Sequence, residues 1–298
     1  MSDVLTPLKY LPTRLDDETA PGPSTAALEA HAHHVRELIV EMCSGGEGGH
    51  VGGSLSLVDI LVTLYFDVMR IDPERPEHPG RDLFVLSKGH GAIGLYATLA
   101  ARGYLTEEQL ATYGKPGSVL SAHPTRKVPG VEMPTGSLGH GLPLGVGFAL
   151  GARLDGSRRR QYVVTGDGEL QEGSNWEAAM AAGAKGLDNL VAVVDRNRLQ
   201  ITGSTEEVMG LDPLADRFRA FGWSAHEVDG HDIDALRAVL GAPAVPGRPT
   251  AIIANTVKGR GISFIEGQAR SHYARLGESQ KKRALSALRR SRREETAR

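Results

Sequence analysis

The spacing of apolar residues changes between a helical and a strand-like pattern along the chain. Apolar residues recur every three to four positions over 35–42 and from about Leu57 to Met69, which predicts two amphipathic helices, the first ended by Gly45-Gly46. Short continuous apolar runs then predict buried strands, and further helical patterns separate them. The predicted strands are 83–86, 162–164, 190–194 and 251–254, and the helical patterns are 93–101, 143–154, 175–184 and 233–240. This alternation predicts an α/β fold, a parallel sheet with helices on both faces.

The chain is expected to form one domain over residues 25–275. No internal repeat or change of composition divides this range. Residues 1–24 contain four prolines and no sustained periodicity, so we expect an extended or disordered arm. Residues 276–298 are rich in lysine and arginine, and we expect a basic tail that is a frayed helix or disordered. The helix near Asn175 has a capping-box pattern, with Ser174 three positions before Glu177.

Composition and charge exclude several classes of protein. The hydrophobic fraction is 40%, the charged fraction 23% and the formal net charge -2, so nothing indicates a nucleic acid partner. Cys43 is the single cysteine, which excludes a disulfide framework and a cysteine-rich metal site. The sequence has no run of about 18 apolar residues and no signal-like leader. We therefore expect a soluble cytoplasmic protein without a membrane partner.

Polar residues follow two successive predicted strands and suggest a metal site. Asp167 lies between Gly166 and Gly168 after one strand, and Asn197 follows 30 residues later, after the next. Ligands of open parallel sheets bind at the carboxyl ends of strands, and one strand–helix–strand unit brings both side chains to that edge. Carboxylate and amide oxygens suit Mg²⁺, and the carbonyl of Leu199 is a reasonable third ligand. Gly-Asp-Gly alone is more often a surface turn, but the pair favours a magnesium–diphosphate site.

The motifs around this pair resemble the thiamine diphosphate enzymes, and among them transketolase rather than the 2-oxo acid dehydrogenases. The resemblance lies in the segments 166–173, 176–179, 195–201 and 256–261, which occur in the family's order. It implies thiamine diphosphate and Mg²⁺ as cofactors, with Asp167, Asn197 and Leu199 at the metal. It also implies cofactor contacts by His90, Gly136, Ser137, Leu138, Gly166, Asp167, Gly168, Glu169, Glu172, Asn197, Ile201, Lys258 and His272.

Four histidines are candidate catalytic residues. His50, His90 and His123 lie in glycine-rich loops, where a single histidine is more often exposed or structural. The resemblance instead implies that they line the donor-sugar channel, with His90 also near the diphosphate. His272 matches a further family histidine, although Tyr273 replaces the usual glycine after it. Imidazoles that titrate near neutral pH suit proton transfer on sugar hydroxyls.

The resemblance also implies a second, partner chain. The resemblance covers about residues 25–275, which match the first of the three transketolase domains. The chain has no match to the domain that binds the aminopyrimidine of the cofactor. We therefore expect an N-terminal subunit that is inactive alone and forms an α₂β₂ assembly with a C-terminal, pyrimidine-binding subunit. Glu172 matches a family glutamate that links two active sites at the subunit interface. The expected activity is transfer of a two-carbon ketol unit between sugar phosphates.

Two alternatives stay open. One is a subunit of another thiamine diphosphate enzyme, either a 2-oxo acid dehydrogenase E1 α-chain or a ketol transferase for unusual sugars. The other is a non-catalytic cofactor-binding subunit. The sequence does not identify the ketose and the aldose.

Overall fold

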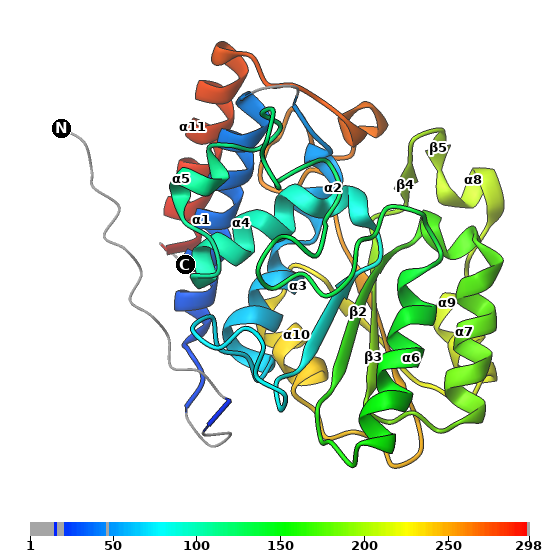
Figure 1. Cartoon of the computed structure of the whole chain (residues 1–298). Helices are drawn as coiled ribbons and strands as arrows, with labels where there is room; N and C mark the ends of the chain where they lie inside the picture. Colours follow the sequence, from blue (N-terminus) through cyan, green and yellow to red (C-terminus); the bar gives the residue numbers. More distant parts are fainter. Residues whose placement is uncertain (1–14, 17–20, 46–47, 297–298) are drawn as a thin grey trace.

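A five-stranded parallel sheet forms the centre of the molecule. The computed structural model describes residues 15–16, 21–45 and 48–296 (Figure 1). The strand order is β1-β2-β3-β7-β6, and every pair is parallel. The strands are β1 (Leu83–Leu86), β2 (Gln161–Gly166), β3 (Leu190–Arg196), β6 (Ser224–Asp229) and β7 (Thr250–Asn255), and a short hairpin pairs β4 (Leu199–Gln200) with β5 (Gly203–Ser204). The predicted α/β fold is confirmed.

Helices cover both faces of the sheet (Figure 1). The α-helices are α1 (Thr25–Ser44), α2 (Val51–Ser56), α3 (Val58–Thr63), α4 (Ala92–Arg102), α5 (Glu107–Leu110), α6 (Gly141–Leu154), α7 (Gly173–Ala184), α8 (Thr205–Met209), α9 (Leu214–Ala220), α10 (Ile233–Leu240) and α11 (Glu278–Thr296). Short turns of other helix types are η1 (Leu64–Val68), η2 (Gly89–Gly91), η3 (Gly168–Gln171) and η4 (Ala269–His272). The predicted helix 57–69 is thus α3 followed by η1, a π-helical turn.

Two apolar cores lie on opposite faces of the sheet, and alternate strand residues feed each of them. Tyr162 and Val164 of β2 pack into the core with α1, α3, α4 and α10, whereas Val163 packs into the core with α6, α7 and α9. Strands β2 and β3 are buried along their whole length. Burial on both faces explains why these strands appear in the sequence as continuous apolar runs.

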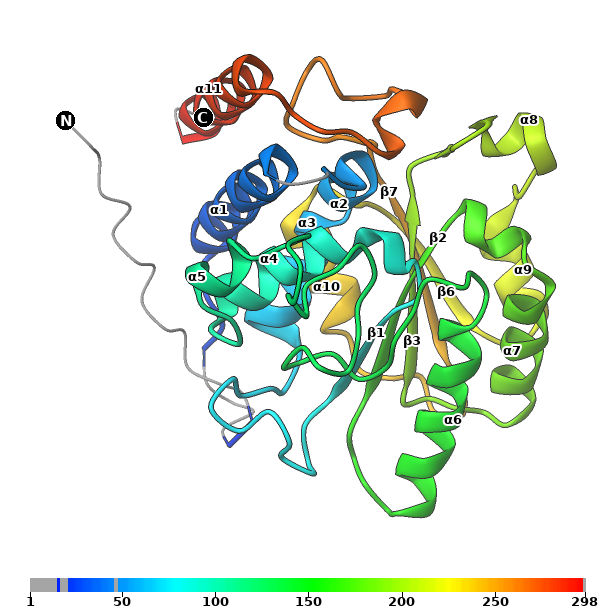
Figure 2. The same cartoon turned by 45° about the horizontal axis from the view of Figure 1, so that its top comes forward.

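The basic C-terminal segment forms the helix α11, and one side of that helix packs on the core. In α11, Ala284 and Leu288 are fully buried and pack into the core beside α1 (Figure 2). The ammonium of Lys281 pairs with Glu41 of α1 at 2.5 Å. Although most residues of α11 are polar or basic, Ala284 and Leu288 form a short apolar stripe that packs the helix against the core.

The structure differs from the sequence-based predictions at β6 and at the start of α7. The strand β6 was not predicted, because this edge strand is largely exposed and lacks a continuous apolar run. The capping box at Ser174 is wrong: α7 begins at Gly173 after Glu172, and the Ser174 hydroxyl donates to the Gly139 carbonyl at 2.7 Å. Most of the expected arm, 1–14 and 17–20, lies outside the described residues. Within the described ranges, no helix has the length and apolarity needed to cross a membrane.

Candidate functional site

The carboxyl ends of β2 and β3 lie side by side and carry the central residues of the site. Gly166 pairs in register with Asp195, and the next amide, of Asp167, donates to the Asp195 carbonyl at 3.3 Å. A cavity of about 460 Å³ opens at this edge, and Asp167, Asn197 and Leu199 all line it. The parallel register therefore brings together the three residues that the sequence predicts as metal ligands.

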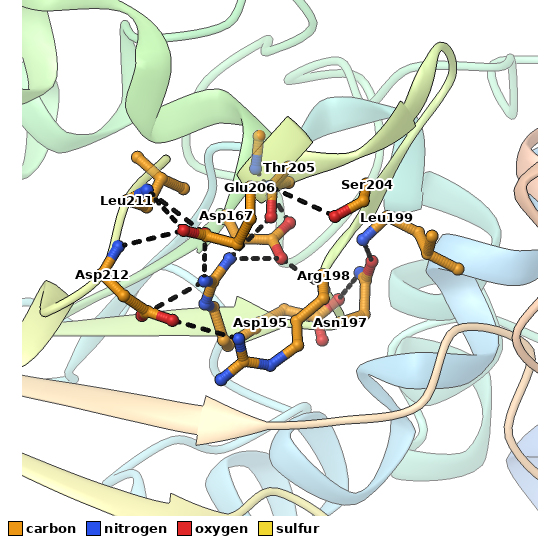
Figure 3. Close-up of polar contacts among 12 residues, drawn as sticks. Asp167, Asp195, Asn197, Arg198, Leu199, Ser204, Thr205, Glu206, Leu211 and Asp212 are labelled. Atoms are coloured by element: carbon orange, nitrogen blue, oxygen red, sulfur yellow. Dashed lines mark hydrogen bonds and ion pairs between the residues drawn. The ribbon is translucent and has the colours of Figure 1, made fainter. Parts of the chain in front are cut away.

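The Asp167 carboxylate is buried and held by backbone donors. Its Oδ1 accepts the Gly168 amide at 2.8 Å, and its Oδ2 accepts the Arg198 amide at 2.5 Å (Figure 3). The guanidinium of Arg196 lies 3.3 Å from Oδ2. Burial, followed by repulsion from Asp195, raises the pKa of Asp167. A nearby cation would offset both effects, which suits the proposed metal position.

Asn197 and Leu199 occupy a tight turn beside this carboxylate. The Asn197 amide oxygen accepts the Leu199 N–H at 3.1 Å, and its Nδ2 donates to Asp195 at 3.3 Å (Figure 3). Arg198 between them has a positive φ of 63°. One carboxylate, one amide and one carbonyl form a hard oxygen set that fits Mg²⁺. The described part of the chain holds no cluster of three or more His, Cys, Asp or Glu residues suited to a metal, so this mixed set is the candidate.

Cationic and glycine residues make the cavity suitable for a diphosphate. Lys258 donates to the Leu199 carbonyl at 2.9 Å, and burial, with a smaller effect of Lys88, lowers the pKa of Lys258 to about 8. Gly136 has φ 144°, and a Cβ there would come within 2.7 Å of the His123 ring. Gln200 carries a buried amide oxygen that has no hydrogen-bond partner among the described residues. A narrow cradle with an ammonium group fits an anionic cofactor. The Gln200 oxygen is an acceptor, so it suits a hydroxyl or amino group of a ligand rather than the anion.

The four predicted histidines form one cluster in this cavity. The ring centroid of His50 lies 5.5 Å from that of His90, 5.9 Å from that of His123 and 5.3 Å from that of His272. An antiparallel bridge between Gly49 and Ala274 holds the segment of His50 against the segment of His272, with N–H···O distances of 3.0 and 2.9 Å.

Three of these imidazoles, those of His50, His90 and His272, are neutral at physiological pH. Burial lowers the pKa of His50 and of His272 to about 4, with smaller effects of His123 on His50 and of Lys258 on His272. Burial and Lys88 also lower the pKa of His90 well below its ordinary value. The sequence-based expectation of titration near pH 7 therefore does not hold for these three side chains. Neutral imidazoles can still accept a proton or a hydrogen bond from a sugar hydroxyl.

Comparison with known proteins identifies the family. Residues 28–291 match the family model of the transketolase thiamine diphosphate binding domain. The chain belongs to the transketolase family.

Several relatives in this family match most of the chain. It is 47% identical over 247 residues to an apulose-4-phosphate transketolase subunit of Phocaeicola vulgatus, a match that covers 83% of this chain and 88% of that protein. It is 46% identical over 263 residues to the 6-deoxy-6-sulfo-D-fructose transketolase subunit SqwG of a Clostridium species, covering 88% and 96%.

Solved transketolases share the fold but are longer. The transketolase of Campylobacter jejuni superposes with a TM-score of 0.82 at 32% identity, covering 88% of this chain and 42% of that one. For the Leishmania mexicana transketolase the TM-score is 0.79 at 30% identity, covering 93% and 46%. This transketolase family chain thus spans less than half the length of these solved relatives.

The other residues predicted for this transketolase family site differ in whether they line the cavity and in what they bind. The carboxylate of Glu169 lines the cavity, but it accepts the Gly139 and Gly166 amides, each at 3.0 Å, and the Ser87 hydroxyl, so it ties three loops together. Ser137 lines a separate hollow. The remaining predicted residues that line the cavity are Leu138, Gly166, Gly168, Glu172 and Ile201.

Five lining residues were not predicted, and one of them, Lys88, carried a signal in the sequence. They are Gly53, Lys88, Gln171, Gln200 and Thr202. Lys88 precedes His90 in the same glycine-rich loop, and its buried ammonium pairs with Asp195 and donates to the Gly53 carbonyl at 2.8 Å. A lysine two positions before a candidate loop histidine, and two positions after the last residue of a predicted buried strand, could have been singled out for its burial.

Proposed function

We propose that this chain is the N-terminal, diphosphate-binding subunit of a two-chain transketolase that uses thiamine diphosphate and Mg²⁺. The observation that carries the proposal is a single cavity lined by Asp167, Asn197 and Leu199 together with the four-histidine cluster. The alternative of a non-catalytic cofactor-binding subunit is less favoured, because the histidines are all present and converge on the cavity.

The cofactor would be held by the oxygens and cations described above. Asp167, Asn197 and the Leu199 carbonyl would coordinate Mg²⁺, and Lys258 and His90 would face the diphosphate. When bound, thiamine diphosphate supplies a centre that stabilises a carbanion. The protein supplies orientation, because each proposed ligand is fixed by a hydrogen bond to a neighbouring backbone or side chain group.

The histidines would handle the hydroxyl protons of the sugars. His50 contacts each of the other three rings, so it lies at the centre of the cluster. His272 is held near Lys258, with 3.1 Å between the ammonium and Nδ1. Because His50 and His272 are neutral at pH 7, they are competent to accept a proton from a ketose hydroxyl and return it to the product. Breaking the C2–C3 bond of the ketose would release an aldose and leave a two-carbon unit for the acceptor.

A second chain would supply the remaining part of the active site. The coverage of the relatives supports this arrangement. The match covers 88–96% of the length of two relatives named as transketolase subunits, but about two fifths of the length of the Campylobacter jejuni transketolase. The partner would carry the pyrimidine-binding domain, and we propose an α₂β₂ assembly. Glu172, exposed at the start of α7, is the proposed link to a neighbouring subunit.

The substrates would be a ketose and an aldose, both phosphorylated in our proposal. The relatives are named for apulose 4-phosphate and for 6-deoxy-6-sulfo-D-fructose, so a specialised ketol transferase is a second candidate. The test is to express the chain with a candidate C-terminal subunit, then to assay a panel of ketoses with ribose 5-phosphate as acceptor. We expect turnover by the mixture and none by either chain alone. Full turnover by this chain alone would contradict the proposal.

A further inference from the structure

Arg196 is a buried cation that contacts acidic residues from two parts of the chain. It ends β3, directly before Asn197, and only 1% of its surface is exposed. Its Nη1 lies 3.3 Å from Asp167 Oδ2 and donates to the Thr205 hydroxyl at 2.8 Å. Its Nη2 lies 2.5 Å from Glu206 Oε1 and 3.2 Å from Asp212 Oδ1. The side chain thus joins the proposed metal carboxylate to the segment 203–212.

We propose that Arg196 is a positioning residue that sets the orientation of the Asp167 carboxylate for the metal and fixes the segment 203–212 beside the cofactor. The inference rests on the proposed function, because it takes Asp167 as a metal ligand. It adds a residue that touches neither the substrate nor the metal and acts through Asp167.

The geometry requires an arginine rather than a simple positive charge. A guanidinium presents several N–H groups in a fixed plane, so it can hold partners on two sides at once. Here one terminal nitrogen faces Asp167 and Thr205 while the other faces Glu206 and Asp212. A lysine has a single ammonium on a flexible stem and cannot make this bridge.

The distances show which acid holds the guanidinium most closely. Glu206 lies 2.5 Å from it, whereas Asp167 lies at 3.3 Å. The short contact to Asp167 Oδ2 comes instead from the neutral Arg198 amide, at 2.5 Å. Glu206 and Asp212 therefore offset much of the arginine charge, while its Nη1 still lies within hydrogen-bond distance of Asp167. The guanidinium thus orients the Asp167 carboxylate while its own charge is shared with two other acids.

The same contacts hold the segment 199–212, part of which lines the cavity. Glu206 also accepts the Leu211 amide at 3.2 Å, and Arg198 pairs with Asp212 at 3.1 Å (Figure 3). These bonds tie both ends of α8 to the end of β3. The hairpin β4–β5 lies between them, and its residues Gln200, Ile201 and Thr202 line the cavity. Loss of Arg196 is thus expected to loosen this segment as well as the carboxylate.

The test measures Mn²⁺ affinity in the presence of thiamine diphosphate by electron paramagnetic resonance, on the full chain mixed with its C-terminal subunit. Removing a cation near a metal site would by electrostatics alone strengthen Mn²⁺ binding. Loss of positioning would instead weaken Mn²⁺ binding, because changes to residues that orient metal ligands typically lower the metal affinity about 10–100-fold. We expect Arg196→Met to weaken Mn²⁺ binding by about 10–100-fold, with Arg196→Lys between it and the wild type.

Glu206→Gln provides a second variant that leaves the arginine in place. The arginine charge would then be less neutralised and drawn toward Asp167, so we expect Mn²⁺ binding about 10-fold weaker. Arg219→Met is the matched control, because Arg219 pairs with Asp216 on α9, outside the cavity lining, and it should bind Mn²⁺ as the wild type does. Hydrogen exchange over 199–212 should be faster in Arg196→Met and unchanged in the control.

The outcomes separate the inference from the proposed function. Equal or tighter Mn²⁺ binding by Arg196→Met would overturn the inference, and so would unchanged binding by Glu206→Gln if Arg196→Met does not fold. Failure of the wild-type assembly to bind Mn²⁺ with thiamine diphosphate would refute the proposed function itself, and the inference with it.

Discussion

Replacing Asp167 by asparagine changes one atom at the centre of the proposed metal site. The carboxylate now accepts the Gly168 amide on one oxygen and the Arg198 amide on the other. An asparagine has a single acceptor oxygen, so its NH₂ group would face one of these buried donors. A buried donor without a partner costs about 1–3 kcal/mol. Burial and Asp195 already disfavour the charged form of Asp167, so its removal offsets part of this cost. We expect a loss of about 1–2 kcal/mol in the free energy of unfolding.

The effect on cofactor binding should be much larger than the effect on stability. The variant removes the only formal negative charge among the three proposed metal ligands, and Lys258 and Arg196 remain as cations nearby. We expect thiamine diphosphate to bind at least 100-fold more weakly in Mg²⁺, which corresponds to about 2.7 kcal/mol. The assay is calorimetric titration of the chain with its partner, with Asp216→Asn as the exposed control. Affinity within threefold of the wild type, in a protein with a normal melting curve, would refute the metal assignment.

Three other changes test separate parts of the molecule. Lys258→Met should weaken thiamine diphosphate binding about tenfold or more while thiamine itself binds unchanged, because a charged hydrogen bond to the diphosphate is lost. The pKa of His50 and of His272 is about 4 in the folded chain and near 6.5 when unfolded, so the unfolded state binds more protons between these values. The free energy of unfolding should therefore fall as pH falls from 6.5 to 4, and urea titrations of a His50→Gln, His272→Gln variant should show a flatter dependence. Leu288→Ala should cost about 2–5 kcal/mol in chemical denaturation, because the side chain is fully buried between α11 and the core; a cost below 0.5 kcal/mol would argue against the packing of α11.

The centre of the fold was predictable because its strands are buried on both faces. The predicted strand 83–86 matches β1, and the predicted strand 190–194 lies within β3. The strand β6 lies at the sheet edge with His226 and Glu227 exposed, so its sequence has no apolar run to detect. The helix α11 was obscured in the same way, because basic residues outnumber the two buried positions that hold it.

The site residues were predictable in identity but not in arrangement. The spacing of Asp167 and Asn197 indicated one sheet edge, because parallel strands end together. No local pattern reveals that Glu169 binds the amide of Gly139, 30 residues earlier, or that Arg196 bridges to Glu206. Such contacts depend on how loops meet in three dimensions. The lowered pKa of His50 and of His272 likewise follows from burial, which the sequence around these histidines does not disclose.

The most direct test follows two labelled carbons from one sugar to another. A ketose phosphate labelled with ¹³C at positions 1 and 2 is incubated with an aldose acceptor, thiamine diphosphate and Mg²⁺, while the C-terminal subunit is titrated into a fixed amount of this chain. We predict that both labelled carbons appear together in the new ketose, that the rate saturates at equal amounts of the two chains, and that Asp167→Asn abolishes the transfer. Transfer of label at the full rate without the second chain, or at an undiminished rate by the variant, would contradict the account.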